Sequence, residues 1–437
     1  MASRKSTSPT SLQTSRRHFL QVSAALAAGC FVTGKPANAA SRMANEKLNI
    51  AVIGPGGRGH DNLMGVSSEN IVALVDADFR RAAKAFELFP NAKKYSDYRK
   101  LFDSPNEIDA VVTSTPDHTH AAPTSIAMKL GKHVYTEKPL THSLFEARSL
   151  QETAAATKVA TQMGTQIHAG DNYRRVVEII QSGAIGPVSE VHVWVGKGWG
   201  GGELPTDKPP VPEGLDWNSW VGPAPFRDFS PTYVPANWRR WWDFGNGTLG
   251  DMGCHYMDLP FWALGLKHPT LITASGPPLN PQTAPIGMTA EYSFPAVGKQ
   301  PACTLKWYDG TMAPKEIKGR KVAGSGVFFV GATGEMFADY GGYKLYPEEK
   351  FAEFKAPEQT IPKSIGHHQE WIRACKTGEP TTCSFDYSGP LTETVLLGCL
   401  AFRMQKPIAW DAVNLKCPGT PEADAIINRP YREGWTL

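Results

Sequence analysis

The fold is decided by the stretch Lys47–Asp76, which reads KLNIAVIGPGGRGHDNLMGVSSENIVALVD. An apolar run over residues 47–53 is followed by the pattern G-x-G-x-x-G over 54–59, and a second apolar run over 71–75 ends at Asp76. Glycines in such a turn let the backbone approach a pyrophosphate, and the N-terminus of the following helix supplies N–H donors. The stretch therefore predicts a strand, a phosphate-binding turn, a helix and a second strand, the first unit of a nucleotide-binding fold.

Candidate cofactor ligands lie in this turn and at the end of the second strand: Gly54, Gly56, Arg58, Gly59 and Asp76. Asp76 stands twenty-two residues after Gly54. A carboxylate in this position can accept hydrogen bonds from the 2′-hydroxyl of a ribose, and it repels a 2′-phosphate. The sequence therefore favours NAD as the cofactor over NADP.

The alternation of apolar runs and helical segments continues to residue 163. We predict helices at 79–88, 117–130 and 143–157, and strands at 108–113, 132–136 and 158–163. Repeated strand–helix units of this size predict a parallel, doubly wound sheet whose ligand lies at the carboxyl ends of the strands. Two polar segments fall at such ends, TPDHTH over 115–120 and EKP over 137–139.

The first of these segments contains three residues of types that bind metals, namely Asp117, His118 and His120. They can be read as part of a metal site, or as a helix-capping aspartate followed by solvated histidines. No third cluster with ligand spacing lies nearby in the sequence, so we favour the interpretation without a metal.

The composition is that of an ordinary globular protein long enough for two domains. The 437 residues are 41% hydrophobic and 20% charged, and 45 Lys and Arg stand against 42 Asp and Glu, a net charge of +3. So small a surplus argues against a protein built to bind nucleic acid. No apolar run reaches the length of a membrane span, and seven cysteines in a chain of this length do not indicate a disulfide scaffold.

Residues 1–40 carry five basic residues and no acid. The segment SRRHFL over 15–20 is followed by an apolar stretch over 22–32 and by ANAA over 37–40. This order resembles a twin-arginine (Tat) export signal and predicts a periplasmic protein; a disordered terminus is the alternative, and a lipid anchor at Cys30 is less favoured. Removal of the segment would leave 40 Lys and Arg against 42 Asp and Glu, a net charge of −2.

After Gly164 the pattern changes, and a second domain is expected. A helix is predicted at 171–181 and a half-buried strand at 188–195. Residues 196–214 are rich in Gly and Pro and too long for a simple connection, so they form either a lid over the site or a mobile surface arm. The start of a later helix, His367-His368, reads as solvated. Further strands are expected at 287–294, 302–308, 327–331 and 335–340, and closing helices at 367–376 and 391–404.

Two features of this second half concern substrate chemistry. Five of the twelve tryptophans lie within 217–242; most of them read as packing, and at least one is expected to face the substrate. In the segment GDMGCHYMD over 250–258, Asp251 and His255 stand one helical turn apart, and Cys254 between them reads as packing. The pair can be a metal site, a structural pair or an acid/base pair, and a metal site is disfavoured because open sites need three protein ligands.

These motifs resemble the Gfo/Idh/MocA family, the glucose-fructose oxidoreductase and inositol dehydrogenase group. The resemblance rests on G-x-G-x-x-G, Asp76, the TPDHTH segment, Glu137-Lys138-Pro139 and the later D-x-x-x-H, and it covers essentially all of residues 47–437. It implies a Rossmann domain followed by an α/β domain with a large, mostly antiparallel open sheet. With the signal at 1–40, the two domains are expected at 41–165 and 166–437.

The resemblance also implies roles for individual residues. Lys138 would be the catalytic lysine, and its bond to Pro139 is expected to be cis. The D-x-x-x-H match favours Asp251 and His255 as an acid/base pair. The cofactor would be lined, in addition to the glycine turn and Asp76, by Thr115, Pro116, His120, Glu137 and Gln166.

The expected activity is the oxidation of a sugar, glycoside or polyol hydroxyl by hydride transfer to tightly bound NAD. His255 would be the general base, oriented by Asp251, and Lys138 would stabilise the developing alkoxide. Candidate substrate-binding residues are His168, Arg174, Trp238 and Arg239. The alternatives are net glycoside cleavage through transient oxidation, and a non-catalytic dinucleotide- and sugar-binding protein. We further expect a homo-oligomer, dimer or tetramer, with no metal and no nucleic-acid partner.

Overall fold

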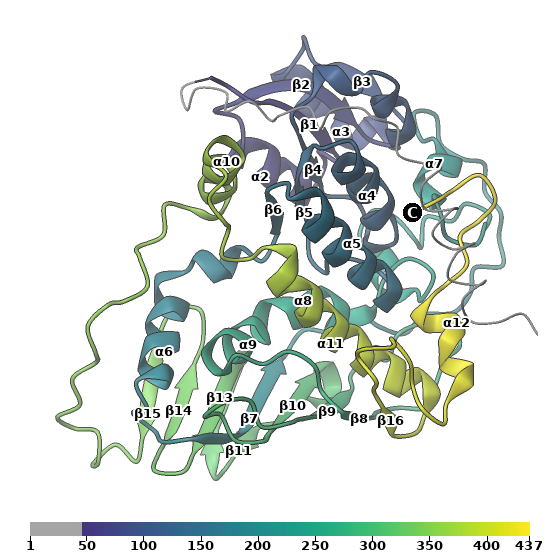
Figure 1. Cartoon of the computed structure of the whole chain (residues 1–437). Coiled ribbons are helices and arrows are strands. Elements are labelled where there is room, and N and C mark those ends of the chain that lie inside the picture. Colours follow the sequence, from purple (N-terminus) through teal and green to yellow (C-terminus); the bar gives the residue numbers. More distant parts are fainter. Residues whose placement is uncertain (1–45) are drawn as a thin grey trace, which may run out of the picture. The chain divides into compact units, whose positions relative to one another are not determined.

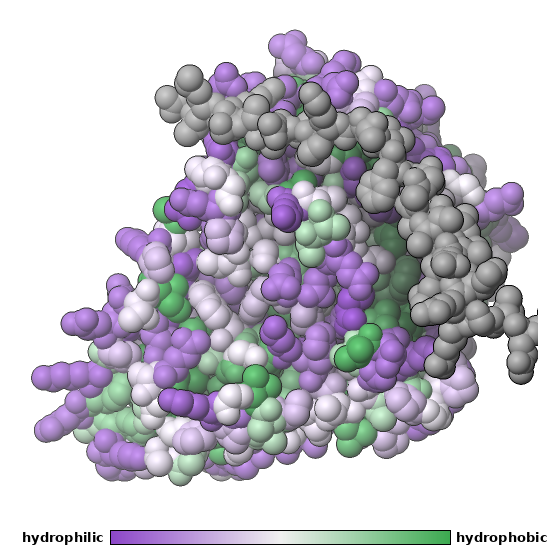
Figure 2. Space-filling view, viewed as in Figure 1, coloured by the Kyte–Doolittle hydropathy of each residue, from purple (hydrophilic) through white to green (hydrophobic). Residues whose placement is uncertain are grey.

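The structure is a computed structural model that describes residues 46–437 (Figure 1). The predicted export signal lies outside the described residues. Within the described part of the chain, no helix is both long enough and apolar enough to cross a membrane. Figure 2 shows one face of the molecule, on which hydrophilic side chains cover most of the area and hydrophobic ones form smaller areas among them.

The first half forms a six-stranded sheet in the order β3-β2-β1-β4-β5-β6, and every pair in it is parallel. The strand order reverses between β1 and β4, which creates the crevice in which ligands of such sheets bind. This confirms the predicted doubly wound sheet. Its elements are β1 (Asn49–Ile53), α2 (Arg58–Gly65), β2 (Asn70–Val75), α3 (Phe79–Leu88), β3 (Lys93–Tyr95), β4 (Ala110–Thr113), α4 (Ala121–Lys129), β5 (His133–Thr136), α5 (Leu144–Thr157) and β6 (Thr161–Met163).

Alternate residues of β1 face opposite sides of this sheet, as the period of a strand requires. Ala51 and Ile53 belong to a buried cluster that also contains residues of α4 and α5. Ile50 and Val52 belong to a second cluster that contains residues of α2, α3 and α10 (His367–Thr377). Both faces are therefore covered by helices, as a near-continuous apolar strand predicts.

In this first half, two elements begin three or more residues later than the sequence predicts. The helix expected at 117–130 is interrupted, because Asp117–Thr119 form a 3-10 turn and α4 begins only at Ala121. The strand expected from residue 158 begins at Thr161, because Lys158 adopts a left-handed conformation (φ 56°) that caps the end of α5.

The second half forms an eight-stranded sheet in the order β15-β14-β13-β7-β10-β9-β8-β16. Only β7 and β10 pair in parallel; the other neighbours in the sheet are antiparallel. The sheet is thus mostly antiparallel, as expected. Its strands are β7 (Val188–Val195), β8 (Leu271–Ser275), β9 (Thr289–Phe294), β10 (Cys303–Asp309), β13 (Ser325–Gly331), β14 (Glu335–Ala338), β15 (Tyr343–Tyr346) and β16 (Ile408–Ala409), and β11 (Glu316–Ile317) and β12 (Arg320–Lys321) form a separate hairpin.

Helices cover one face of this second sheet (Figure 1). They are α6 (Asp171–Gln181), α8 (Gly247–Tyr256), α9 (Asp258–Leu264) and α11 (Phe385–Met404). The longest of them, α11, starts six residues before the predicted position of 391 and contains Pro390 within its second turn. Because a proline near a helix start removes only one hydrogen bond, it does not end the helix.

Helix α10 returns from the second half to the first. Trp371 and Ile372 of this helix are buried among the residues of β1 and β4. The histidines at its start are not solvated as predicted: His367 is 5% exposed and its Nε2–H donates to the main-chain oxygen of Met163, and His368 stacks on Tyr135. Tertiary packing of α10 against the first sheet removes both from water.

Candidate active site

The glycine turn after β1 leaves room that only glycine can provide. A Cβ on Gly54, whose φ is +79°, would lie 2.8 Å from the main-chain oxygen of Ser114. A Cβ on Gly59 would lie 1.7 Å from the oxygen of Gly54. The N-terminus of α2 behind this turn has no side-chain cap; the N–H groups of Gly59 and His60 donate to the oxygens of Gly56 and Gly57, and the positive end of the helix faces the turn, where it favours an anion.

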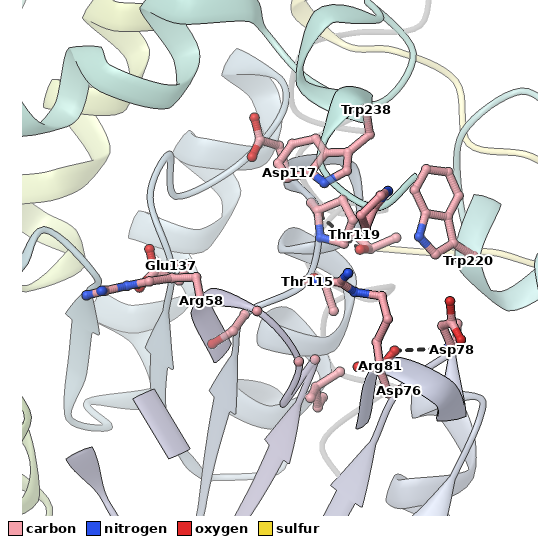
Figure 3. Close-up of a pocket in the computed structure, with 18 of the residues that line it drawn as sticks. Arg58, Asp76, Asp78, Arg81, Thr115, Asp117, Thr119, Glu137, Trp220 and Trp238 are labelled. Carbon is pink, nitrogen blue, oxygen red and sulfur yellow. Dashed lines mark hydrogen bonds and ion pairs between the residues drawn. The ribbon is translucent and has the colours of Figure 1, made fainter. Parts of the chain in front are cut away.

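A cleft of about 1260 Å³ opens at this turn. Its walls include the ends of four parallel strands, because Gly54 follows β1, Asp76 follows β2, Ser114 follows β4 and Glu137 follows β5. Figure 3 shows Trp220 and Trp238 on one side of the cleft and Asp76, Arg81 and Thr115 on the other. Of the predicted cofactor ligands, the lining contains Gly54, Gly56, Arg58, Asp76, Thr115, Pro116, His120 and Glu137. Gly59 supports the turn from behind.

Gln166, the remaining predicted cofactor ligand, does not line the cleft. It belongs to the 3-10 turn Gln166–Ala169, and its Nε2 donates to Glu137 Oε1 (2.7 Å) and to Tyr135 Oη (2.8 Å). Glu137 Oε1 also accepts from Asn62 Nδ2 at 2.9 Å. Gln166 therefore positions Glu137. The sequence predicted that Gln166 lines the cofactor; in the structure it lies behind Glu137, which lines the cleft.

Asp76 lies where a ribose hydroxyl is expected. Its Oδ1 accepts a hydrogen bond from the backbone N–H of Asp78 at 2.9 Å. Burial raises its pKa to about 6, and the negative charge of Asp78 adds to this, while Arg81 opposes it. The guanidinium of Arg81 lines the same part of the cleft, and the sequence prediction did not single it out.

The substitution Asp76→Ala is expected to weaken NAD binding about 10- to 100-fold, since a hydrogen bond to a charged group contributes about 1.5–3 kcal/mol. The ratio of NADP to NAD affinity should rise, because the repulsion of a 2′-phosphate is lost while Arg81 stays in the cleft. Fluorescence titration with both cofactors measures this. Asp103→Ala, which removes an exposed carboxylate paired with Lys100 outside the cleft lining, is the control and should change neither affinity. An unchanged ratio in Asp76→Ala would exclude this position for the ribose.

The cation of Lys138 is held in place by Asp251. Lys138 Nζ donates to Asp251 Oδ1 and to the Asp251 main-chain oxygen, both at 2.9 Å. Burial opposes the charge of this lysine, but the carboxylates of Asp251 and Glu137 raise its pKa above the ordinary value. The bond from Lys138 to Pro139 is cis, as predicted. Lys138 is therefore a fixed cation in the wall of the cleft.

The Asp251 carboxylate forms ion pairs with three cationic side chains. Besides the bond from Lys138, it accepts hydrogen bonds from Arg239 Nε at 3.0 Å, Lys197 Nζ at 3.1 Å and Trp199 Nε1 at 2.8 Å. Burial alone would raise the pKa of Asp251, but the charges of Lys138, Arg239 and Lys197 hold it well below its usual value. The carboxylate is ionised, and it orients the lysine.

The predicted pairing of Asp251 with His255 is not formed. Both residues belong to α8 and stand one turn apart, but the carboxylate turns toward the cations instead. His255 Nδ1 is buried without a hydrogen-bond partner among the described residues, and burial together with the charge of Lys138 lowers the pKa of His255 to about 3. The Asp251 carboxylate is attracted more strongly to the cations around it than to His255, its neighbour in α8. His255 is therefore a neutral ring, and it does not line the cleft.

Two of the four predicted substrate-binding residues lie at the cleft. Trp238 lines it, and the guanidinium of Arg239, which also lines it, lies 4.3 Å from the centre of the Trp238 ring. The other two do not reach it. His168 stacks on Trp262 and hydrogen-bonds Asp258, and Arg174 donates to the main-chain oxygen of Pro362. These contacts hold both side chains away from the cleft, although His168 Nε2 and Arg174 Nε are buried without a hydrogen-bond partner among the described residues.

The tryptophans of 217–242 combine packing and exposure to the cleft. Trp217, Trp220, Trp238 and Trp241 belong to one buried aromatic cluster, which includes α7 (Trp217–Val221). Trp220 and Trp238 of this cluster also line the cleft. Both parts of the prediction hold: most of the rings pack, and two face the ligand space.

The Gly/Pro-rich segment 196–214 packs against the site. The Trp199 backbone N–H donates to Thr248 Oγ1 of α8 at 2.6 Å, and the Gly201 N–H donates to the oxygen of Ala284 at 2.8 Å. At its other end the oxygen of Gly214 accepts from the N–H of Phe79. These contacts favour the interpretation as a cover of the site over that of a surface arm.

Asp117 is the functional candidate that the sequence interpretation placed wrongly. It does not cap the helix; Pro116 precedes the turn, and no side-chain cap bond is made. Its carboxyl lines the cleft, where burial raises its pKa to about 7 although Arg239 and Lys138 oppose the rise. Its place four residues after the end of β4, near the carboxyl end of a parallel strand, is the signal that could have identified it.

The two histidines beside Asp117 are buried, not solvated. His120 is 1% exposed and lies between the main-chain oxygens of Pro139 (2.8 Å) and Thr115 (2.7 Å). His118 Nε2 lies 2.9 Å from the oxygen of Trp220. They connect the strand ends to Lys138-Pro139 and to the aromatic cluster. Among the residues described, no group of three or more His, Cys, Asp or Glu side chains is arranged to hold a metal ion.

A glycine turn, a carboxylate and a lysine at the ends of parallel strands, with a second α/β half, are typical of two-domain dinucleotide-binding oxidoreductases. Two family models match: "Oxidoreductase family, NAD-binding Rossmann fold" over residues 48–165 and "Oxidoreductase family, C-terminal alpha/beta domain" over residues 171–437. The chain belongs to the Gfo/Idh/MocA oxidoreductase family, and its first domain is an NAD-binding Rossmann domain. The glycine turn at Gly54 and Gly59 fits a backbone that approaches the pyrophosphate of NAD closely.

Curated relatives match part of the chain. Inositol 2-dehydrogenase 2 of Saccharopolyspora erythraea is 33% identical over 150 residues, which are 33% of this chain and 44% of the relative. Levoglucosan dehydrogenase of Pseudarthrobacter phenanthrenivorans is 24% identical over 238 residues, which are 50% of this chain and 52% of the relative. The chain thus spans about half, or less, of the length of these curated relatives.

Solved structures match most of the fold. GenD2 from gentamicin A biosynthesis, in complex with NAD, gives a TM-score of 0.60 at 19% identity and covers 84% of this chain and 97% of its own. Levoglucosan dehydrogenase in complex with NADH gives a TM-score of 0.56 at 17% identity and covers 83% of this chain and 99% of its own. At these identities the likeness shows the shared fold alone.

Proposed function

We propose that the protein is an NAD-dependent oxidoreductase that oxidises a CH–OH group of a sugar or polyol. The observation that carries the proposal is the ion pair of Lys138 with Asp251, at 2.9 Å, in the wall of the NAD cleft. Relatives named inositol 2-dehydrogenase and levoglucosan dehydrogenase support the substrate class. No comparison favours net glycoside cleavage or a non-catalytic role.

Each group of the cleft has a part in this reaction. The glycine turn and Asp76 hold the cofactor, and NAD when bound supplies a nicotinamide ring that accepts a hydride from the substrate carbon. Lys138, a fixed cation, stabilises the alkoxide that forms as the hydroxyl loses its proton. Trp238 offers a flat apolar face to the C–H side of a sugar ring.

We assign the proton acceptor to Asp117 in place of His255. A base works best when its pKa lies near the working pH, and Asp117 lines the cleft with a pKa raised to about 7 by burial. His255 has its pKa lowered to about 3 by burial and lies outside the lining, so it is a much weaker base.

The pH profile of kcat/KM tests this assignment. The carboxylate form of Asp117, which accepts a proton, exists above a pKa of about 7, so kcat/KM should rise as the pH passes through this value. In Asp117→Asn the rise of kcat/KM with pH should disappear, and the rate should fall about 10²–10⁴-fold. In His255→Gln the rise of kcat/KM should remain. If only His255→Gln removed the rise of kcat/KM with pH, His255 would be the proton acceptor and Asp117 would not.

The same group has a consequence for stability. Because burial raises its pKa, folded Asp117 keeps a proton that the unfolded chain loses between about pH 4 and pH 7, so its contribution to folding becomes less favourable as the pH rises through this window. Asp117→Asn should therefore melt at a higher temperature than the wild type at pH 8, and the difference should shrink toward pH 4. Calorimetry at both pH values measures it.

The substrate class is tested by absorbance of NADH at 340 nm with NAD and a panel of substrates, including myo-inositol and levoglucosan. The proposal expects reduction of NAD by at least one polyol or sugar and no reduction with the same panel in Lys138→Met. If the panel leaves NAD oxidised while an aglycone is released from glycosides, the net reaction is cleavage and the proposal fails.

We also propose that the protein is exported by the twin-arginine route and acts in the periplasm. The proposal is supported only by the sequence of residues 1–40. Export of a folded protein suits a cofactor that stays tightly bound. N-terminal sequencing of protein from the periplasmic fraction checks both the location and the cleavage site near residue 40.

A further inference from the structure

A second cavity, of about 760 Å³, lies apart from the NAD cleft and shares no lining residue with it. Its walls come from the start of α5, the segment before α8, the helix α11 and the region of α12 (Asp424–Ile427). Three cationic or ionisable nitrogen-bearing side chains line it, His142, Arg403 and Arg429. Nothing in the proposed reaction uses them.

Positive charge exceeds negative charge around this cavity. Arg403 has no hydrogen bond or ion pair with any described residue, and its guanidinium contacts only the Trp242 ring, 5.2 Å from the ring centre. The nearby carboxylate of Asp243 is already paired with Arg227 at 2.5 Å. Partial burial lowers the pKa of Arg403, and the neighbouring Cys399 and Asp243 oppose this lowering without forming a hydrogen bond or ion pair with it.

The two terminal nitrogens of the Arg429 guanidinium differ in their contacts. Its Nη2 donates to Glu146 Oε1 at 2.9 Å, while its Nη1 is buried without a partner among the described residues. Three arginines, Arg227, Arg403 and Arg429, thus face two carboxylates, Asp243 and Glu146. One unit of positive charge is left without compensation.

His142 adds polar atoms that also lack partners. The side chain is 7% exposed, and neither Nδ1 nor Nε2 makes a well-aligned hydrogen bond to the described residues, although the main chain of Trp242 lies close enough to favour the charged ring. Buried polar groups are nearly always paired, so Arg429 Nη1 and the single N–H of the neutral His142 ring, two donors at one cavity, indicate a missing acceptor. The rest of the wall is apolar and includes Leu396, Leu400 and Ile426.

We propose that this cavity binds a small organic monocarboxylate. The carboxylate accepts hydrogen bonds from Arg403, from Arg429 Nη1 and from His142, and its single charge matches the uncompensated one. The hydrocarbon part packs against Leu396, Leu400 and Ile426. An inorganic anion could satisfy the nitrogens but would leave this apolar wall without a contact.

The cavity adjoins the elements that carry the catalytic ion pair. His142 follows Lys138 by four residues, and its main-chain oxygen accepts from Asn246 Nδ2 at 3.2 Å. Asn246 directly precedes α8, which bears Asp251. An occupied cavity would therefore support both ends of the Lys138–Asp251 contact.

Isothermal titration of the full-length, NAD-saturated protein tests the proposal. Saturating NAD keeps anions out of the glycine turn. The probes are sodium acetate, butyrate, hexanoate and phosphate, each against sodium chloride of the same ionic strength. We expect one saturable site per chain for the carboxylates, with affinity rising about fourfold per buried methylene, and weaker binding of phosphate.

Variants then locate the site. Arg403→Gln and His142→Phe should each weaken hexanoate binding at least tenfold, while Arg403→Lys should retain most of it. Arg373→Gln, which removes an exposed arginine paired with Glu379, should not change it. Absence of saturable carboxylate binding, binding of phosphate alone, or unchanged affinity in both Arg403→Gln and His142→Phe would overturn the proposal. NAD affinity of each variant shows that it is folded.

Discussion

The substitution Lys138→Met is expected to lower kcat by about 10²–10³-fold, the loss that follows removal of one group that stabilises a developing oxyanion. Methionine keeps the length of the stem but removes the charge. The Asp251 carboxylate would not be left buried without partners, because Arg239, Lys197 and Trp199 still donate to it. The protein should therefore fold and bind NAD with nearly unchanged affinity. Steady-state kinetics and a NAD titration on the same preparation measure the two effects separately.

Lys197→Met is the matched control. Lys197 also pairs with Asp251, at 3.1 Å, but its side chain is 47% exposed and it does not line the cleft. Its removal should change kcat by less than tenfold, since exposed ion pairs contribute about 0.2–1 kcal/mol. If Lys138→Met kept turnover within tenfold of the wild type, the cation would have no part in the chemistry.

The substitution Gly59→Ala is expected to abolish NAD binding and to destabilise the fold by about 3 kcal/mol or more. The added Cβ would lie 1.7 Å from the Gly54 oxygen and 2.8 Å from its carbonyl carbon, both of which are main-chain atoms that cannot rotate away. The turn would have to open, and the cradle for the pyrophosphate would be lost. Thermal denaturation with and without NAD measures both effects.

Gly342→Ala is the matched control for this substitution. Nothing lies within 4 Å of the position where its Cβ would stand, so neither stability nor NAD affinity should change beyond about 0.5 kcal/mol. A Gly59→Ala protein that kept the wild-type melting temperature and its stabilisation by NAD would show that the turn yields, and the steric argument would fail.

Much of the fold was predictable because local patterns and tertiary structure agree. The helices at 79–88 and 171–181 and the strand at 188–195 begin and end at the predicted residues. Each has a clear period of apolar residues or a capping residue, such as Asp78, whose side chain accepts from the Arg80 N–H. Strands β3, β8, β15 and β16 were missed, because they are short and lie toward the edges of their sheets, where few residues are buried.

The site was predictable to the extent that it depends on strand ends. Gly54, Asp76, Thr115 and Glu137 lie together because each ends a parallel strand, and parallel strands present their carboxyl ends at one edge. Helical spacing, in contrast, was misleading for Asp251 and His255. One turn of α8 places them on one face, but the direction of the Asp251 carboxylate is set by Lys138, Lys197 and Arg239, which come from three other segments.

The stretch Lys47–Asp76 indicated the nucleotide-binding unit by itself, because the apolar runs, the contact of Gly59 with Gly54 and the acid at Asp76 are properties of thirty consecutive residues. The steric limit at Gly54 comes instead from Ser114, which follows a distant strand. Tertiary structure alone decided which side chains are buried together. It buried His118, His120 and His367, which read as solvated, and it brought Asp117 to a cleft wall where loss of water raises its pKa to about 7. The physical reason is that desolvation and charge pairing depend on neighbours distant in the chain, which no local period encodes.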